Sequence, residues 1–211
     1  MFLFWLFIII CFVPFHIIAP HRVIGKRNIK GKKNYIIASN HRSNFDAIIL
    51  DYTFGKRVRY LAKTELFKTK FSSFFMRNIF GCIEIDRDKG ISPSKYREID
   101  KILTSKQTLG IFPQGTRNEN ISVKGGVCYF AIKYKKPIVP CYIVNKQRFM
   151  KKNLVLLGVP FELDEFYDKK LDKEMIEKAD NVLLGKINAL KEEYEARQKE
   201  KKLVKHIKKN K

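Results

Sequence analysis

Acidic residues are scarce in this sequence. Its 211 residues hold 21 Asp and Glu against 43 Lys and Arg, which gives a formal net charge of +22. Such an excess of positive charge favours an acidic partner: an anionic lipid surface, a phosphorylated substrate, an acidic carrier protein or a nucleic acid. Charge alone does not choose among these partners.

Cysteine pairs, repeats and linkers are also lacking. The four cysteines are widely separated and form no C-x-x-C pair, which argues against a disulfide framework or a metal knuckle and predicts a reducing environment. The chain has no internal repeat and no Gly/Ser linker. It is long enough for one compact core but too short for two ordinary domains, so we expect a single domain.

Residues 1–19, by contrast, are nearly continuous apolar sequence: MFLFWLFIIICFVPFHIIA. No basic region precedes the run and no small-residue cleavage site follows it, which disfavours a signal peptide. The run is close to the roughly 17 to 20 residues of a bilayer-spanning helix, but Pro14 interrupts it. A spanning, re-entrant or interfacial helix therefore remains open, and a buried core helix is a further alternative.

We expect a membrane anchor helix over residues 1–20. Seven Lys, Arg and His residues follow within residues 21–33, which places that flank on the cytoplasmic side if the helix spans. The predicted location is the membrane, with the following domain on its cytoplasmic face. We do not expect nucleic acid as a partner, because the sequence has no RNA-binding signature or zinc-finger pattern.

Beyond the anchor, short β-rich runs alternate with longer helical segments, which is typical of an α/β fold. We expect a mixed sheet flanked by helices over residues 21–170. The predicted strands are residues 34–39, 58–62, 82–85, 108–112, 138–144 and 154–159. The predicted helices are residues 44–54, 65–80, 93–105 and 126–135.

Residues 171–211 have a different character. From residue 171, apolar residues recur at steps of three or four, which predicts an amphipathic helix that packs on the core. Lysine dominates residues 198–211. We expect a solvated, frayed tail there, with contact to lipid headgroups as the alternative.

His41 and Asp46, in the segment Asn-His-Arg-Ser-Asn-Phe-Asp, form a candidate acid–base pair. Positions five apart on an ideal helix are rotated by about 140°, so the two side chains need a bend between them. Ser43 or Asn44 can supply it as a helix N-cap, with His41 on the preceding loop and Asp46 in the first turn. Asp46 can then bond one imidazole nitrogen while the other takes a proton from a hydroxyl. Taken alone, the motif would favour a loop histidine bonded to a helix cap.

Basic residues follow three other predicted strands. Arg117 ends the segment Phe-Pro-Gln-Gly-Thr-Arg, in which the strand breaks at Pro and Gly, and its planar donor fork matches a phosphate. Arg87 and Lys63 each follow an apolar strand. Singly, each is typical of a surface charge. Strand ends in α/β folds gather at ligand sites, so together with His41 they predict a site for a phosphate-bearing ligand.

In this order, the blocks resemble the lysophospholipid acyltransferase family, specifically the bacterial 1-acyl-sn-glycerol-3-phosphate acyltransferases. The resemblance covers most of residues 35–145. His41 and Asp46 match the family's H-x4-D block, and residues 81–87 match its second block. Residues 112–117 match its F-P-E-G-T-R block, and Val139-Pro140 matches its short apolar-proline block.

The resemblance implies an enzyme that transfers a fatty acyl group from a thioester to the sn-2 hydroxyl of lysophosphatidic acid, which forms phosphatidic acid. His41 would be the general base and Asp46 its orienting partner. The implied substrate-binding residues are Lys63, Arg87, Gln114, Gly115, Thr116 and Arg117. The donor would be a thioester of acyl carrier protein or of coenzyme A, the surroundings would be membrane lipids, and no metal or separate cofactor would be needed.

Gln114 departs from the family pattern, which has glutamate there. Glutamine keeps the length and a carbonyl acceptor but carries no charge, so a bond to a neighbouring arginine would be neutral. We expect a change of substrate preference rather than loss of activity. Two alternatives stay open: acylation of another lysophospholipid or an amino-lipid, and a non-catalytic basic membrane-binding protein.

Overall fold

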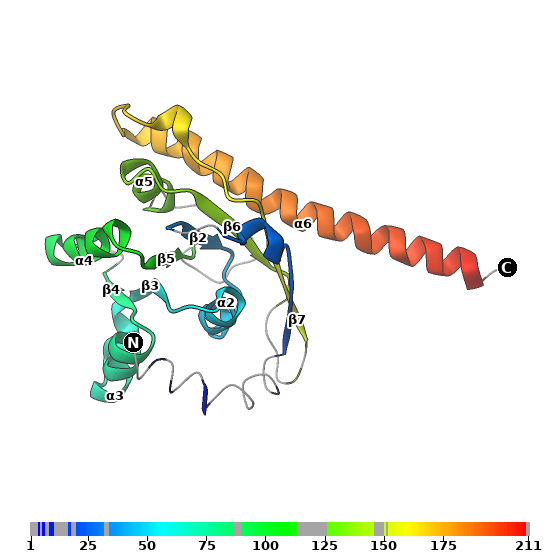
Figure 1. Cartoon of the computed structure of the whole chain (residues 1–211), viewed down its shortest axis with the longest axis horizontal. Coiled ribbons are helices and arrows are strands. Elements are labelled where there is room, and N and C mark those ends of the chain that lie inside the picture. Colours follow the sequence, from blue (N-terminus) through cyan, green and yellow to red (C-terminus); the bar gives the residue numbers. More distant parts are fainter. Residues whose placement is uncertain are drawn as a thin grey trace.

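The computed structural model describes residues 20–31, 34–86, 90–113, 126–145 and 152–209, together with positions 4, 6, 9, 10, 17 and 150. These residues form one sheet with helices on both faces (Figure 1). The α/β fold expected from the alternation of strand and helix patterns is therefore confirmed.

The strands are β1 (His21–Ile24), β2 (Ile36–Ser39), β3 (Val58–Lys63), β4 (Ile83–Ile85), β5 (Thr108–Ile111), β6 (Ile138–Ile143) and β7 (Asn153–Leu157). The α-helices are α2 (Asp46–Phe54), α3 (Lys70–Phe74), α4 (Pro93–Thr104), α5 (Gly126–Lys133) and α6 (Lys173–Lys209). Short helical turns are η1 (Lys26–Ile29), η2 (Thr64–Phe67), η3 (Phe75–Ile79) and η4 (Asp164–Phe166).

The seven strands lie in the order β1-β7-β6-β2-β5-β3-β4. Neighbouring strands are parallel except for β6 and β7, which pair antiparallel. Because β1 is parallel to β7, these two strands run opposite to the other five. The sheet is mixed, as the sequence predicted.

Strand β2 lies in the middle of the sheet and contributes to both cores. Successive side chains of a strand point to opposite faces. Ile36 and Ala38 accordingly join the core formed with α4, α5 and α6, whereas Ile37 joins the core formed with α2, η2 and η3. Figure 1 shows α4, α5 and α6 on one side of the sheet and α2 on the other. All four residues of β2 are buried, so its ends are held in fixed positions.

Helix α6 confirms the amphipathic pattern found in the sequence. Ala179, Leu183 and Ile187 recur every four residues and are fully buried, with α6 packed against α5 and β6. The expected frayed tail is a wrong prediction, since the helix continues to Lys209 and extends beyond the sheet (Figure 1). Lysine is a good helix former, so a lysine-rich end does not by itself end a helix.

Two further predictions differ from the structure. β1 was not expected as a strand, because its four residues are only half-buried and follow the apolar run as a basic flank. The single helix expected over residues 65–80 is divided into η2, α3 and η3. Thr69 causes one break: its side chain accepts a hydrogen bond from the Ser72 backbone N–H in a capping box, which begins a new helix.

The expected membrane anchor over residues 1–20 lies largely outside the described residues. Among the residues that the structure does describe, no helix is long and apolar enough to cross a bilayer.

Gly110 lies in β5 beneath the ring of Tyr60. A Cβ atom at Gly110 would lie 2.4 Å from Tyr60 Cε1 and 2.7 Å from Val58 Cγ1, closer than real carbon atoms approach. We expect Gly110→Ala to lower the free energy of unfolding by about 1 to 3 kcal/mol, because it overpacks the sheet. Denaturant unfolding of the wild type and of Gly110→Ala in the same detergent measures this difference.

Gly185→Ala is the matched control. Gly185 lies inside α6, where nothing lies within 4 Å of a new Cβ atom. Alanine there should raise the free energy of unfolding by about 0.5 to 1 kcal/mol, because it costs less backbone entropy in a helix. Equal effects of the two substitutions would contradict the close approach at Gly110.

Candidate active site

The candidate site lies where β2 and β5 end. β2 has β5 on one side and β6 on the other, and the chain leaves β2 through α2 to reach β3 beyond β5. The chain leaves β5 the other way, through α5 to β6, so the connections after these two adjacent strands run in opposite directions, as they do where open α/β sheets form their ligand crevice. His41 follows β2 at this point, and Phe112 follows β5.

His41 and Asp46 are in contact, as predicted. The Nδ1 atom of His41 lies 2.9 Å from Oδ2 of Asp46, with the aspartate side chain fully buried and the imidazole 19% exposed. A carboxylate only accepts hydrogen bonds, so Nδ1 carries the hydrogen and Nε2 is the nitrogen that takes up a proton. The pair can therefore work as a base that is oriented by a buried anion.

The loop around Asp46 differs in detail from the predicted cap. Phe45 is the N-cap residue of α2. The sequence predicted Ser43 or Asn44 at that position, and this prediction is wrong. The Asp46 carboxylate instead accepts hydrogen bonds from the Arg42 backbone N–H at 2.5 Å, from the Ser43 N–H at 2.7 Å and from the Ser43 hydroxyl at 3.1 Å. With His41, four donors hold one carboxylate, so the bend that the sequence required is built around Asp46 itself.

Asn40 is a positioning residue for which the sequence predicted no role. Its side-chain amide donates to the Ile143 carbonyl at 2.9 Å, and its carbonyl accepts from the Ile143 N–H at 2.6 Å. Asn40 is 2% exposed, so both bonds are shielded from water. They tie the loop that carries His41 to the end of β6. The sequence offered one signal for this role: an asparagine directly before the histidine.

Phe112 joins the two sequence motifs. Its ring stacks on the His41 imidazole, with the ring centres 4.3 Å apart and the planes at 22°. Tyr60 also stacks on Phe112, with the ring centres 5.5 Å apart and an interplanar angle of 11°. The first residue of the second motif therefore packs against the histidine of the first, a contact that the sequence did not predict.

The structure describes only part of the predicted phosphate site. Lys63 is the last residue of β3 and is exposed at the same edge of the sheet as the ends of β2 and β5. The other predicted substrate-binding residues lie outside the described residues: Arg87, Gln114, Gly115, Thr116 and Arg117.

The described part of the chain contains no group of three or more His, Cys, Asp or Glu side chains placed to hold a metal ion. Three cysteines are described, and each is buried and free of a disulfide: Cys82, Cys128 and Cys141. Burial raises the pKa of the Cys82 thiol to about 12. This thiol is therefore protonated near neutral pH and is a poor nucleophile or metal ligand.

The sequence is similar to those of known proteins. The model of a family described as Acyltransferase matches residues 21–144. A 1-acyl-sn-glycerol-3-phosphate acyltransferase of Bacillus subtilis is 30% identical over 152 residues, which are 69% of this chain and 75% of that one. A protein of the same name from Borreliella burgdorferi is 32% identical over 138 residues. That match covers 63% of this chain and 54% of the relative, so the chain spans about half of its length.

A solved structure shares the fold. The crystal structure of the 1-acyl-sn-glycerophosphate (LPA) acyltransferase PlsC from Thermotoga maritima matches with a TM-score of 0.58. The match covers 82% of this chain and 71% of that chain at 23% identity. This likeness supports the α/β architecture with its mixed sheet.

Asp46 and His41 should differ in what they contribute to stability. We expect Asp46→Ala to lower the free energy of unfolding by about 3 kcal/mol, because it leaves the Arg42 and Ser43 backbone N–H groups buried without an acceptor. His41→Ala removes a partly exposed ring and should cost only about 1 kcal/mol. Denaturant unfolding in one detergent compares the two variants. An Asp46→Ala loss no larger than that of His41→Ala would contradict this account of the loop.

Proposed function

Because the chain belongs to the Acyltransferase family, we propose that it transfers a fatty acyl group from an acyl thioester to the sn-2 hydroxyl of lysophosphatidic acid and so forms phosphatidic acid. The names of the relatives from Bacillus subtilis and Borreliella burgdorferi support this choice of acceptor. One geometric observation carries the chemistry: the 2.9 Å contact between His41 Nδ1 and the fully buried carboxylate of Asp46.

The reaction is a direct transfer in which His41 is the general base. As the sn-2 oxygen attacks the thioester carbonyl, Nε2 of His41 takes the hydroxyl proton and the ring becomes an imidazolium. Asp46 stabilises that positive charge through Nδ1. The tetrahedral intermediate then expels the thiolate, which takes the proton back from Nε2. The products are the ester and a free thiol, and the enzyme returns to its starting state.

The acceptor is held by its phosphate. Lys63 ends β3, and Arg87 and Arg117 come after β4 and β5 in the sequence. The carboxyl ends of these strands lie at the edge of the sheet where His41 lies, and cationic donors suit a phosphate. Gln114, Gly115 and Thr116 would complete the binding segment before Arg117. Fixing the phosphate presents the sn-2 oxygen at reacting distance from the base.

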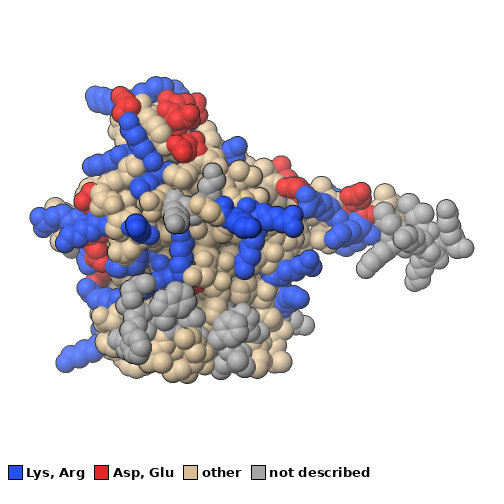
Figure 2. Space-filling view, viewed as in Figure 1, with Lys and Arg blue, Asp and Glu red and all other residues tan. Residues whose placement is uncertain are grey.

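The donor is a thioester of acyl carrier protein or of coenzyme A. Either one is acidic, and Lys and Arg side chains are spread over much of the face shown in Figure 2, in keeping with the net charge of +22. The apolar run over residues 1–19 and the basic flank behind it support a membrane-bound enzyme whose catalytic domain works on the cytoplasmic face.

Release of free thiol from an acyl thioester tests the reaction. We expect the full chain in detergent to release thiol only when lysophosphatidic acid is added. His41→Ala should reduce this acceptor-dependent rate by about 100-fold to 10,000-fold, because the general base is lost. The unfolding measurement on the same variant shows whether the loss reflects chemistry or folding.

Both donor thioesters and several lysolipids belong in the assay. If thiol release depends on a different lysolipid, that lysolipid is the acceptor, and the proposed transferase chemistry still holds. No release from the wild type with any combination would contradict the proposal and favour a non-catalytic membrane-binding protein.

The phosphate ligands are tested by the KM for the acceptor. We expect Arg117→Ala and Lys63→Ala each to raise the KM for lysophosphatidic acid by about tenfold or more, since each removes a charged hydrogen-bond donor. A 1-acylglycerol without phosphate should react slowly with wild type and variants alike. Lys101→Ala, on an exposed turn of α4, is the control and should leave the KM unchanged. An unchanged KM in the first two variants would contradict their assignment.

A further inference from the structure

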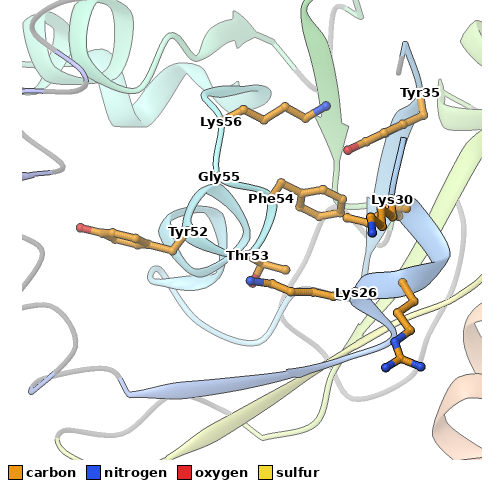
Figure 3. A pocket seen from close by; sticks show the side chains of 10 residues that line it. Lys26, Lys30, Tyr35, Tyr52, Thr53, Phe54, Gly55 and Lys56 are labelled. Atoms are coloured by element: carbon orange, nitrogen blue, oxygen red, sulfur yellow. The ribbon is translucent and has the colours of Figure 1, made fainter. Parts of the chain in front are cut away.

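A cavity lies at the opposite end of α2 from the catalytic pair. It has a volume of about 570 Å³ and is lined by the last turn of α2 and by η1 (Figure 3). Asp46 begins α2, and a helix of nine residues at about 1.5 Å per residue is roughly 13 Å long, so the length of α2 separates the cavity from the catalytic pair. No residue that lines this cavity belongs to the catalytic pair or to the predicted acceptor site.

The cavity gathers positive charge. Four of its lining residues are cationic: Lys26, Arg27, Lys30 and Lys56. Among the residues that the structure describes, no acidic residue lines the cavity and none forms an ion pair with these four. The carboxyl end of α2 carries partial negative charge, which accounts for one nearby cation, Lys56. The remaining three favour an anionic ligand.

Lys56 is held in a partly desolvated position. Its Nζ lies 3.9 Å from the centre of the Tyr35 ring, a cation–π contact. Burial lowers the pKa of Lys56 to about 8. An anion in the cavity would favour the charged ammonium and raise this pKa again. Lys56 is therefore suited to respond to a bound anion.

Thr53 lines the same cavity and has an unsatisfied hydroxyl. The residue is 4% exposed, and its Oγ1 is buried with no hydrogen-bond partner among the described residues. A threonine inside a helix usually returns this bond to a backbone carbonyl of the preceding turn. A buried hydroxyl without a partner is unfavourable, so the site is more stable when a ligand atom bonds to it.

The surroundings of the cavity indicate a lipid. The Phe4 ring, in the apolar amino-terminal run, lies 5.6 Å from the guanidinium carbon of Arg57, next to Lys56. His21, which follows that run, contacts Tyr52 in the cavity wall, with ring centres 6.5 Å apart. Phe4, from the apolar run, and His21, just after it, therefore both lie beside residues at the carboxyl end of α2.

Exposed apolar side chains lie in the same run. Ile9, Ile10 and Ile17 are 69%, 66% and 53% exposed. Exposed isoleucines, tyrosine rings and lysines together are the composition of a surface at the membrane interface, where phosphates of lipid headgroups lie. A soluble phosphate would not need the apolar surroundings.

We propose that this cavity binds the phosphate of an anionic membrane phospholipid headgroup, at a site separate from the catalytic pair. Lys26, Arg27, Lys30 and Lys56 contact the phosphate oxygens, Thr53 donates its hydroxyl hydrogen, and the aromatic wall faces the glycerol backbone. Occupation fixes the domain on the lipid surface. This assignment does not depend on which acceptor the catalytic pair acylates.

Competitive acetylation of lysines, read by mass spectrometry, tests the site directly. The full chain is labelled in nonionic micelles that contain phosphatidylglycerol, phosphatidylcholine or only inorganic phosphate. We expect phosphatidylglycerol to reduce labelling of Lys26, Lys30 and Lys56 by about threefold or more relative to exposed Lys101, because a bound lipid phosphate shields these amines and favours the unreactive ammonium form of Lys56. Inorganic phosphate at the same concentration should have little effect.

Three outcomes would overturn the proposal. Equal protection of Lys101 would show a diffuse charge effect rather than a site. Equal protection by inorganic phosphate would assign the cavity to a soluble anion instead of a lipid. No protection by any probe would show that no phosphate binds there.

Two sets of variants complete the test. Thr53→Val should weaken phosphatidylglycerol binding by about threefold or more, yet raise the melting temperature without lipid, because it removes an unsatisfied hydroxyl. Lys26→Glu with Lys30→Glu should abolish the protection of Lys56. Lys101→Glu with Lys106→Glu changes the net charge equally on exposed positions of another face and should preserve that protection. Protection of Lys56 that is identical in the two double variants would contradict the site.

Discussion

The buried carboxylate of Asp46 accepts hydrogen bonds from His41, from two successive backbone N–H groups and from a serine hydroxyl, and the loop after β2 is folded around it. A buried charge is tolerated only when its acceptor capacity is filled, so this loop has one favourable conformation. That conformation sets the direction of the imidazole. Asn40 and Phe112 then hold the same loop against β6 and β5, so the base rests on three strands of the sheet.

Much of the fold was predictable because it depends on local patterns. The apolar run of β2, the Pro93 start of α4 and the spacing of buried residues in α6 each place the start of an element within about two residues of its observed start, the usual precision of such boundaries. The contact between His41 and Asp46 was also predictable, because only four residues separate them and a bend in this short segment brings the two side chains together without help from the rest of the protein.

Features that depend on distant residues were not predictable in this way. β1 is a short, half-buried strand whose partner β7 lies about 130 positions later in the chain, so no local pattern distinguishes it from a loop. The bonds from Asn40 to Ile143 join residues 103 positions apart, and the stacking of Phe112 on His41 joins two separate motifs. Each contact requires the completed sheet, and the cavity beside Thr53 likewise exists only once η1 lies against the end of α2.

The most direct test of the central claim is a crystal structure of the protein with lysophosphatidic acid bound and no acyl donor present. We expect the sn-2 hydroxyl oxygen to lie within about 2.6 to 3.2 Å of His41 Nε2, with Nδ1 still bonded to Asp46 and the acceptor phosphate among the basic strand ends. A hydroxyl bound away from Nε2, or a His41 ring turned so that Nδ1 leaves Asp46, would contradict it.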